Sequence, residues 1–102
     1  MAATKLKITA FEHYSELKIL INHPMENGRN RDVNGQLIPA HFIQELQIVR
    51  NQSLLINLQL GPSVSKHPLL VFHLEKLQSG EKIGVSWIDN QSQSDSVEQI
   101  IS

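Results

Sequence analysis

The residues best able to do chemistry in this sequence are its five histidines, because cysteine is absent. Zinc ligands usually include two residues at short local spacing, together with a second pair that completes the site. Here no two histidines are closer than six positions, and none forms a recognisable ligand box with an acidic residue; they are His13, His23, His41, His67 and His73. The spacing therefore predicts neither a metal site nor another cofactor. Because it sits in an expected strand, His73 is predicted to be partly buried and hydrogen-bonded to the backbone.

Nucleophilic and acid–base chemistry have even less support. The serines lie in expected turns or in the polar tail, and none stands in a G-x-S-x-G setting. The acidic residues are single and mostly at outward-facing positions, so no acid–base pair can be placed. The five glycines are distant from one another and form no phosphate-binding loop. The sequence predicts no catalytic residues and thus a protein that is not an enzyme.

The densest irregular segment is residues 21–39, INHPMENGRNRDVNGQLIP. Structureless connections of this length are uncommon in compact domains and are often binding loops. Arg29 and Arg31 offer planar donors for carboxylates or oxyanions, and Glu26 and Asp32 could hold them in place. Met25 adds an adaptable apolar contact. Two interpretations stay open: a binding loop, or a connector whose prolines and glycines only turn corners.

The elements that must position this segment show a two-residue alternation of apolar and polar side chains. Such alternation is typical of strands with one buried face. It is clear in residues 16–22, in 53–60, where Leu54, Ile56, Leu58 and Leu60 share a face, and in 82–89, where Trp87 is expected in the core. Turn-forming residues separate the runs. About seven short strands so spaced predict an all-β sandwich.

Three segments need separate interpretation. Residues 69–76, LLVFHLEK, are apolar on both faces at their start, which indicates an interior strand. Residues 39–52 fit a helical face as well, but the alternation of Phe42, Leu46 and Ile48 favours a strand. The tail is polar through residue 96 and then apolar, which predicts a final edge strand.

Length and composition narrow the class of protein. The 102 residues suit one domain spanning residues 1–102, with 40% hydrophobic and 19% charged residues. A net charge of −1 with scattered basic residues predicts no binding to nucleic acid or to an anionic membrane. The first residues, MAATKLKITAFEHYSE, lack the apolar stretch of a signal peptide, and no run approaches membrane-spanning length.

Residues 21–39 also carry a resemblance to a known family. The block HPM…G…R.D..G..IP resembles the pattern of the SoxZ family, with Asn22 where serine is usual and Asn27 where threonine is usual. The similarity continues through residues 58–75 and 79–94. Two departures lie outside the main block: Leu69 stands where the family often has tyrosine, and Gln91-Ser92 replaces a turn glycine.

The resemblance implies more than the residues alone predict. It implies an immunoglobulin-like β-sandwich that is a non-catalytic subunit of the SoxYZ sulfur carrier of thiosulfate oxidation. Its partner would be SoxY, whose C-terminal Gly-Gly-Cys-Gly-Gly arm holds the sulfur intermediate, with transient docking to other Sox proteins. The heterodimer would lie in the periplasm, reached by co-export with SoxY. The candidates for partner contact are His23, Pro24, Met25, Arg29, Arg31 and Asp32.

One alternative stays open beside this interpretation. The chain could be a generic β-sandwich module, alone or as a homodimer, whose loop binds a different anionic ligand or protein. An adjacent reading frame ending in Gly-Gly-Cys-Gly-Gly would favour the carrier, and its absence would favour the generic module.

Overall fold

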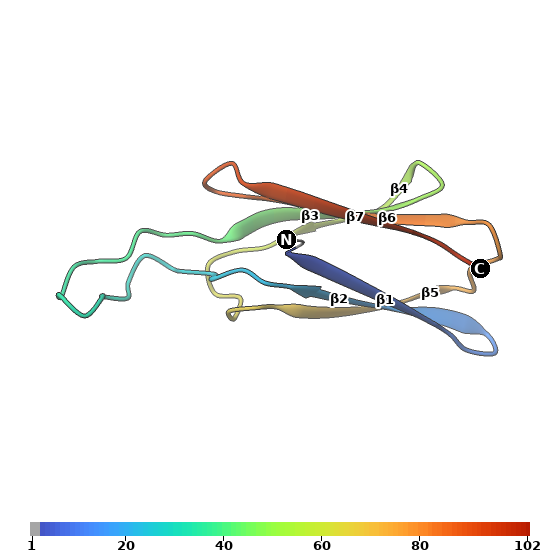
Figure 1. The fold of residues 1–102 in the computed structure, drawn as a ribbon, viewed down its shortest axis with the longest axis horizontal. Coiled ribbons are helices and arrows are strands. Elements are labelled where there is room, and N and C mark those ends of the chain that lie inside the picture. Colours follow the sequence, from blue (N-terminus) through green and yellow to red (C-terminus); the bar gives the residue numbers. More distant parts are fainter. Residues whose placement is uncertain (1–2) are drawn as a thin grey trace.

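The computed structural model describes residues 3–102 and contains two β-sheets packed face to face (Figure 1). A three-stranded sheet has the order β1-β2-β5, and a four-stranded sheet has the order β4-β3-β6-β7. All neighbouring strands are antiparallel. The strands are β1 (Thr4–Ala10), β2 (Tyr14–Ile21), β3 (Ile43–Arg50), β4 (Ser53–Gln59), β5 (Leu69–Glu75), β6 (Lys82–Asp89) and β7 (Ser94–Ile100). The predicted β-sandwich of about seven strands is confirmed.

The strand order is close to that of immunoglobulin-like sandwiches. As in that fold, the first, second and fifth strands share a sheet, and the chain crosses between the sheets after β2 and after β5. Here β4 pairs with β3, whereas an immunoglobulin constant-type sandwich places its fourth strand in the opposite sheet. The described residues contain no helix that could cross a membrane.

The core comes from the alternating apolar residues of the central strands. Leu17, Ile19 and Ile21 of β2 are fully buried, and they share one core cluster with residues of β3 and β6: Ile43, Leu46, Ile48, Ile83, Val85 and Trp87. Burying one such aliphatic side chain contributes about 1.5–3 kcal/mol. The expected core position of Trp87 is confirmed, with 6% of the residue exposed.

Residues 39–52 form strand rather than helix over Ile43–Arg50, as favoured. The predicted face is correct for Leu46 and Ile48, but Phe42 lies before the strand and is only half-buried. A register shift between Ile43 and Glu45 against β6 places Ile43, rather than its neighbours, in the core. The irregularity removes the strict two-residue period on which the prediction rested.

The edge strands differ from the sequence expectations in two places. Residues 69–76 were expected to form an interior strand, but among residues 3–102 β5 pairs with β2 alone and is an edge strand. Leu54 was expected to share a buried face with Ile56, yet it is 57% exposed. A bulge places Val49 opposite Leu54 and Ile48 opposite Ile56, so the strand changes phase between those two residues. The expected final edge strand is confirmed as β7.

The expectation for His73 is also wrong. Its side chain is 58% exposed, and its Nε2 atom lies 3.2 Å from Oε2 of Glu16 on the neighbouring strand. Its ring lies 4.8 Å from that of Tyr14. Because β5 is an edge strand with one face in solvent, an odd-numbered position such as 73 points outward.

Candidate functional site

Residues 22–42, which join β2 to β3, form an extended two-armed projection that we call the finger. It reaches beyond one end of the sandwich (Figure 1), and the molecule measures 52 × 24 × 23 Å along its principal axes. The two arms run antiparallel, with isolated bridges between Glu26 and His41 and between Arg31 and Leu37. Backbone hydrogen bonds of 2.7 and 2.9 Å join Glu26 and His41 in both directions. The irregular segment is therefore an ordered hairpin rather than a structureless loop.

The tip of the finger is closed by Asp32. Its Oδ1 atom accepts hydrogen bonds from the backbone N–H groups of Asn34 at 2.9 Å and Gln36 at 3.0 Å. Gly35 follows with a φ of 81°, in the left-handed region that glycine adopts without steric cost. Arg31 Nη1 donates to the carbonyl oxygen of Gly35 at 2.8 Å. An Asx turn, a glycine and an arginine thus fix the shape of the tip.

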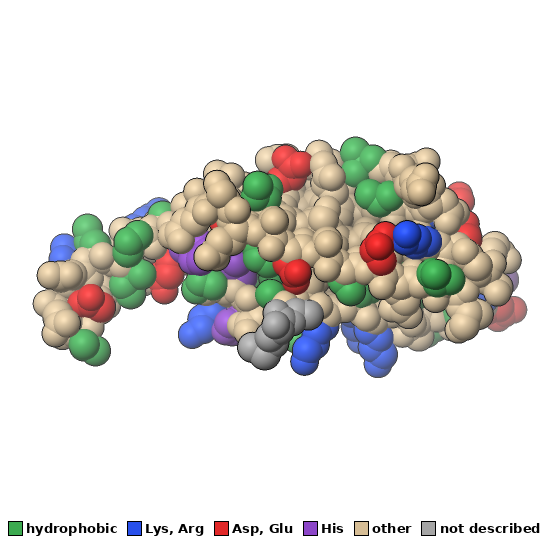
Figure 2. Space-filling view, turned by 45° about the horizontal axis from the view of Figure 1, so that its top comes forward, with side chains coloured by type: hydrophobic (Ala, Val, Ile, Leu, Met, Phe, Trp, Pro, Cys, Tyr) green, Lys and Arg blue, Asp and Glu red, His purple; other side chains and the backbone are tan. Residues whose placement is uncertain are grey.

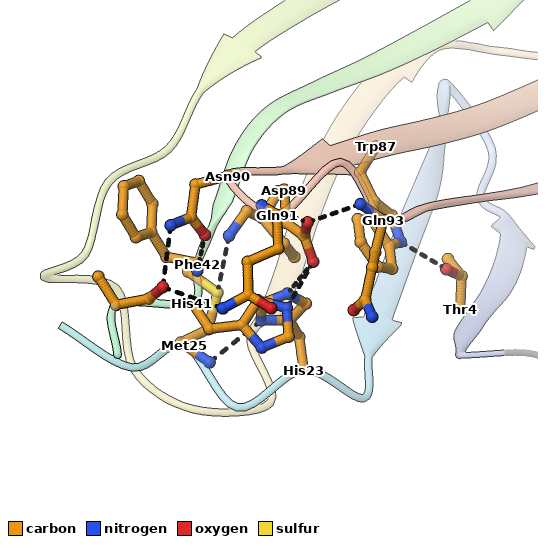
Figure 3. Close-up of polar contacts among 12 residues, drawn as sticks. Thr4, His23, Met25, His41, Phe42, Trp87, Asp89, Asn90, Gln91 and Gln93 are labelled. Atoms are coloured by element: carbon orange, nitrogen blue, oxygen red, sulfur yellow. Dashed lines mark hydrogen bonds and ion pairs between the residues drawn. The ribbon is translucent and has the colours of Figure 1, made fainter. Parts of the chain in front are cut away.

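The base of the finger is a largely buried cluster of side chains from three distant parts of the chain (Figure 3). His23 follows β2, His41 precedes β3, and Asp89 ends β6. Oδ2 of Asp89 lies 3.0 Å from Nε2 of His23 and 2.7 Å from Nε2 of His41. The other carboxylate oxygen accepts from the backbone N–H groups of Gln91 and Gln93. One carboxylate therefore joins both arms of the finger to the β6–β7 turn.

The hydrogen bonds of His23 determine its tautomer. Its Nδ1 atom accepts from the backbone N–H of Met25 at 3.1 Å, so the proton of the neutral ring must lie on Nε2. That Nε2–H then donates to Asp89. The ring also packs edge-on against Trp87, with 5.3 Å between ring centroids. Both nitrogens and one edge of the ring are engaged, and the residue is 2% exposed.

Two further contacts complete the base. Met25 has a φ of 47°, which is uncommon for a residue with a side chain, and its sulfur accepts the backbone N–H of Ile43 at 3.4 Å. His67 Nδ1 accepts the backbone N–H of His23, and the His67 N–H donates back to the carbonyl of His23. These hydrogen bonds of Met25 and His67 therefore fix the direction in which the chain leaves the sandwich after β2.

The charge of Asp89 is part of this arrangement. Burial by itself raises the pKa of its carboxyl group, but hydrogen bonds from His23, the Gln93 amide, His41 and the Gln91 amide outweigh burial. Its pKa therefore lies below the ordinary carboxyl value. Asp89 is ionised at neutral pH, and it accepts from all four donors at once.

The same three side chains bring together enough ligand atoms for a metal ion. Their nitrogen and oxygen atoms lie within 4.8 Å of one another. A zinc bond through Nε2 of neutral His23 would require that ring proton to sit on Nδ1 instead. Nδ1 faces the N–H of Met25, so two donors would then oppose each other. The hydrogen bonding thus favours a structural cluster over a metal centre.

The candidate contact residues divide into two groups. His23 and Met25 are buried in the base, where they fix the finger. The other four lie on the exposed part of the finger: Pro24, Arg29, Arg31 and Asp32. Glu26 and Asp32 do not hold the arginines as expected, since Glu26 accepts from Asn30 and Asp32 closes the tip. The finger also exposes apolar surface, with Val33 at 99% and Leu37 at 55% (Figure 2).

Sequence reasoning missed His41, Asp89 and His67 as parts of the same cluster as His23. Their separations from His23 in the sequence reach 66 positions, and a search for local ligand spacing cannot detect them. One signal was present: Trp87 and Asp89 lie in the last block of the family resemblance, and His23 lies in the first. The structure shows that the two blocks meet (Figure 3).

The family of the chain follows from comparison with known proteins. A search of curated proteins found no match. Residues 5–99 match the family described as "Sulphur oxidation protein SoxZ". The match spans all of the finger and its base and nearly all of the 102 residues. The chain therefore belongs to the SoxZ family of sulfur oxidation proteins.

Proposed function

We propose that this chain is the non-catalytic subunit of a SoxYZ-type sulfur carrier in thiosulfate oxidation. It binds a SoxY-like subunit and helps present that subunit's cysteine-bound sulfur intermediate to the other Sox enzymes. Its place in the cell is the periplasm, reached by co-export with SoxY. Membership of the SoxZ family supports participation in sulfur oxidation, and the finer roles are our proposal.

The observation that carries the proposal is the finger. The hairpin projects from the sandwich and exposes apolar side chains at its tip, and contact of such side chains with water is unfavourable. Buried hydrogen bonds fix its base, so a partner would meet a preformed surface and lose little conformational entropy on binding. Arg29 and Arg31 add donors for carboxylates beside this apolar surface. A projecting, prearranged surface of this kind is suited to binding another protein.

Two further features support a non-catalytic role. The chain has no cysteine, so a thiol-bound intermediate must be carried by another subunit. In the part of the chain that the structure describes, His23 and Asp89 are buried, His41 is half-buried, and all three are hydrogen-bonded to one another or to the backbone. These hydrogen bonds hold the backbone of the finger in place, which is a structural role.

The test is reconstitution with a SoxY-like chain. After exposure to thiosulfate and the Sox cytochrome, intact-mass measurement should find the sulfur adduct on the SoxY-like chain and none on this one. The double variant Arg29→Ala/Arg31→Ala should fold normally yet weaken partner or enzyme docking. An adduct on this chain would contradict the non-carrier role, and unchanged docking and turnover would exclude the two arginines from the contact surface.

A further inference from the structure

The free edge of β5 presents an uninterrupted row of backbone hydrogen-bonding groups. The backbone N–H of Ile21 donates to the carbonyl of Pro68, so the hydrogen-bonded pairs between β2 and β5 fall on even-numbered residues of β5. The N–H and C=O groups of the alternate residues therefore point away from β2: Leu69, Val71, His73 and Glu75. Among the described residues, no strand pairs with this edge.

The other three edges are protected in ways that β5 is not. The edges of β1 and β7 lie against each other across the two sheets, where Thr4 Oγ1 donates to Asp95 Oδ2 at 2.8 Å. The edge of β4 is broken by the bulge opposite Ile48 and Val49. Bulges, covering contacts and edge lysines are the usual devices that prevent a sheet from pairing with another chain. Strand β5 has no bulge, proline or lysine over Leu69–Glu75.

The side chains beside this edge are also unusual for a solvated surface. Leu69 is 59% exposed and Val71 48% exposed, and Leu20, which is paired with Leu69, is 41% exposed. These three apolar side chains form the outward corner of the sheet next to the base of the finger. An exposed apolar corner beside an unpaired strand edge is typical of a surface that contacts another protein.

We propose that the SoxY-like subunit docks by adding a β-strand to the free edge of β5, which extends the three-stranded sheet across the heterodimer. This inference rests on the proposed function, and it identifies the surface of this chain that the SoxY-like subunit contacts. The added strand would place alternate apolar side chains beside Leu69 and Val71, whose exposed surface continues to Leu20 on β2. Main-chain hydrogen bonds would supply affinity, and the apolar corner would set the register. The finger, at the same end of the sheet, would meet the same partner.

The proposal predicts an alternating pattern of amide hydrogen exchange. In the isolated chain, the amides of Leu70, Phe72 and Leu74 exchange slowly, because they donate to β2. The amides of Leu69, Val71 and His73 exchange quickly. In the complex these three should slow by roughly 100-fold or more, so that the alternation disappears. Partner contact with only the outer face of the sheet would leave the alternation in place.

Two variants test the same edge by affinity. Val71→Pro removes an N–H that bonds to nothing within the sheet, so the fold should survive while the added strand loses a hydrogen bond and meets the proline ring. Val71→Lys places a charge on the apolar corner, and it provides the same affinity test if Val71→Pro does not fold. Each should weaken binding of the SoxY-like chain by roughly tenfold or more. Ser96→Pro is the matched control, because Ser96 is an outward-facing residue at the centre of edge strand β7.

The outcomes separate this inference from the function on which it rests. If wild-type chains form no complex, the proposed function fails and the inference with it. If a complex forms but Val71→Pro and Val71→Lys bind normally and the alternating exchange persists, the inference alone is wrong. If the alternation disappears in the isolated chain at high concentration, a second copy pairs with β5 and the assigned occupant is wrong. Weakened binding by both Val71 variants, normal binding by Ser96→Pro and the loss of alternation together would support it.

Discussion

Replacing Asp89 with asparagine should reveal how the base of the finger is held. The substitution keeps the size of the side chain but turns Oδ2 into an NH₂ group that faces Nε2 of His23 and of His41. His41 can respond by moving its proton to Nδ1 and accepting from the new NH₂ group. His23 cannot, because its Nδ1 already accepts from the Met25 N–H. One buried N–H is therefore left facing another donor.

The expected loss of stability follows from the hydrogen bonds that the substitution removes. A buried donor left without a partner costs about 1–3 kcal/mol, and hydrogen bonds to a charged acceptor are stronger than neutral ones by about 1 kcal/mol. We expect Asp89→Asn to lower the free energy of unfolding by about 2–4 kcal/mol. For a domain of this size, that corresponds to a fall in Tm of roughly 10–25 °C. Thermal and denaturant unfolding followed by circular dichroism would measure it.

Asp32→Asn is the matched control. Asp32 lies exposed at the tip of the finger, and its Oδ1 accepts only from backbone N–H groups, which an asparagine oxygen can replace. We expect a change within about 0.5 kcal/mol. If Asp89→Asn changed stability no more than Asp32→Asn does, the Asp89 carboxylate would not be the group that holds the base of the finger.

The wild type and Asp89→Asn should also differ in their stability at acid pH. Because folding lowers the pKa of Asp89, the stability that its charge supplies is present above the ordinary carboxyl pKa of about 4 and is lost as the pH falls through the lowered value. The free energy of unfolding of the wild type should thus fall more steeply below about pH 4 than that of Asp89→Asn. Parallel curves would show that this carboxylate does not contribute to the acid sensitivity.

Three further predictions follow from the finger and its base. Gly28→Ala should destabilise the protein by about 1–2 kcal/mol, and by more than Gly35→Ala does in thermal unfolding. Both glycines have a positive φ, but only at Gly28 would the new methyl group meet another side chain, that of Ala40 at 3.3 Å. Trp87→Phe should cost about 1–3 kcal/mol in denaturant titrations, because it removes core volume and the 2.8 Å hydrogen bond from Nε1 to Thr4. Zinc at micromolar concentration should leave Tm unchanged, and ¹⁵N NMR should find the proton of His23 on Nε2; a zinc-dependent rise in Tm would contradict the hydrogen-bonding argument.

Part of this structure was predictable from the sequence because it depends on neighbours along the chain. Alternation in β2 and β6 correctly predicted strands and buried faces, since every second residue of a regular strand faces the same layer. The alternation failed where a bulge shifts the phase, as at Leu54 and at Ile43. It also could not show that β5 lies at an edge, because an apolar strand has the same pattern whether or not a second neighbour covers it.

The candidate site was predictable only in location. The composition of residues 21–39 and the family resemblance both identified the finger, and its exposed arginines could be named from the sequence. The division of roles could not, because it depends on contacts between residues far apart in the chain. His23 belongs to the buried base through Asp89, 66 positions away, and local spacing contains no trace of that pairing.

Titration calorimetry of this chain with a SoxY-like chain tests the central proposal most directly. We expect saturable binding at a 1:1 ratio with a dissociation constant below the micromolar range, and co-elution of the two chains on size exclusion. Absence of binding heat, together with separate elution at micromolar concentration, would contradict the assignment of this chain as the partner subunit of a sulfur carrier.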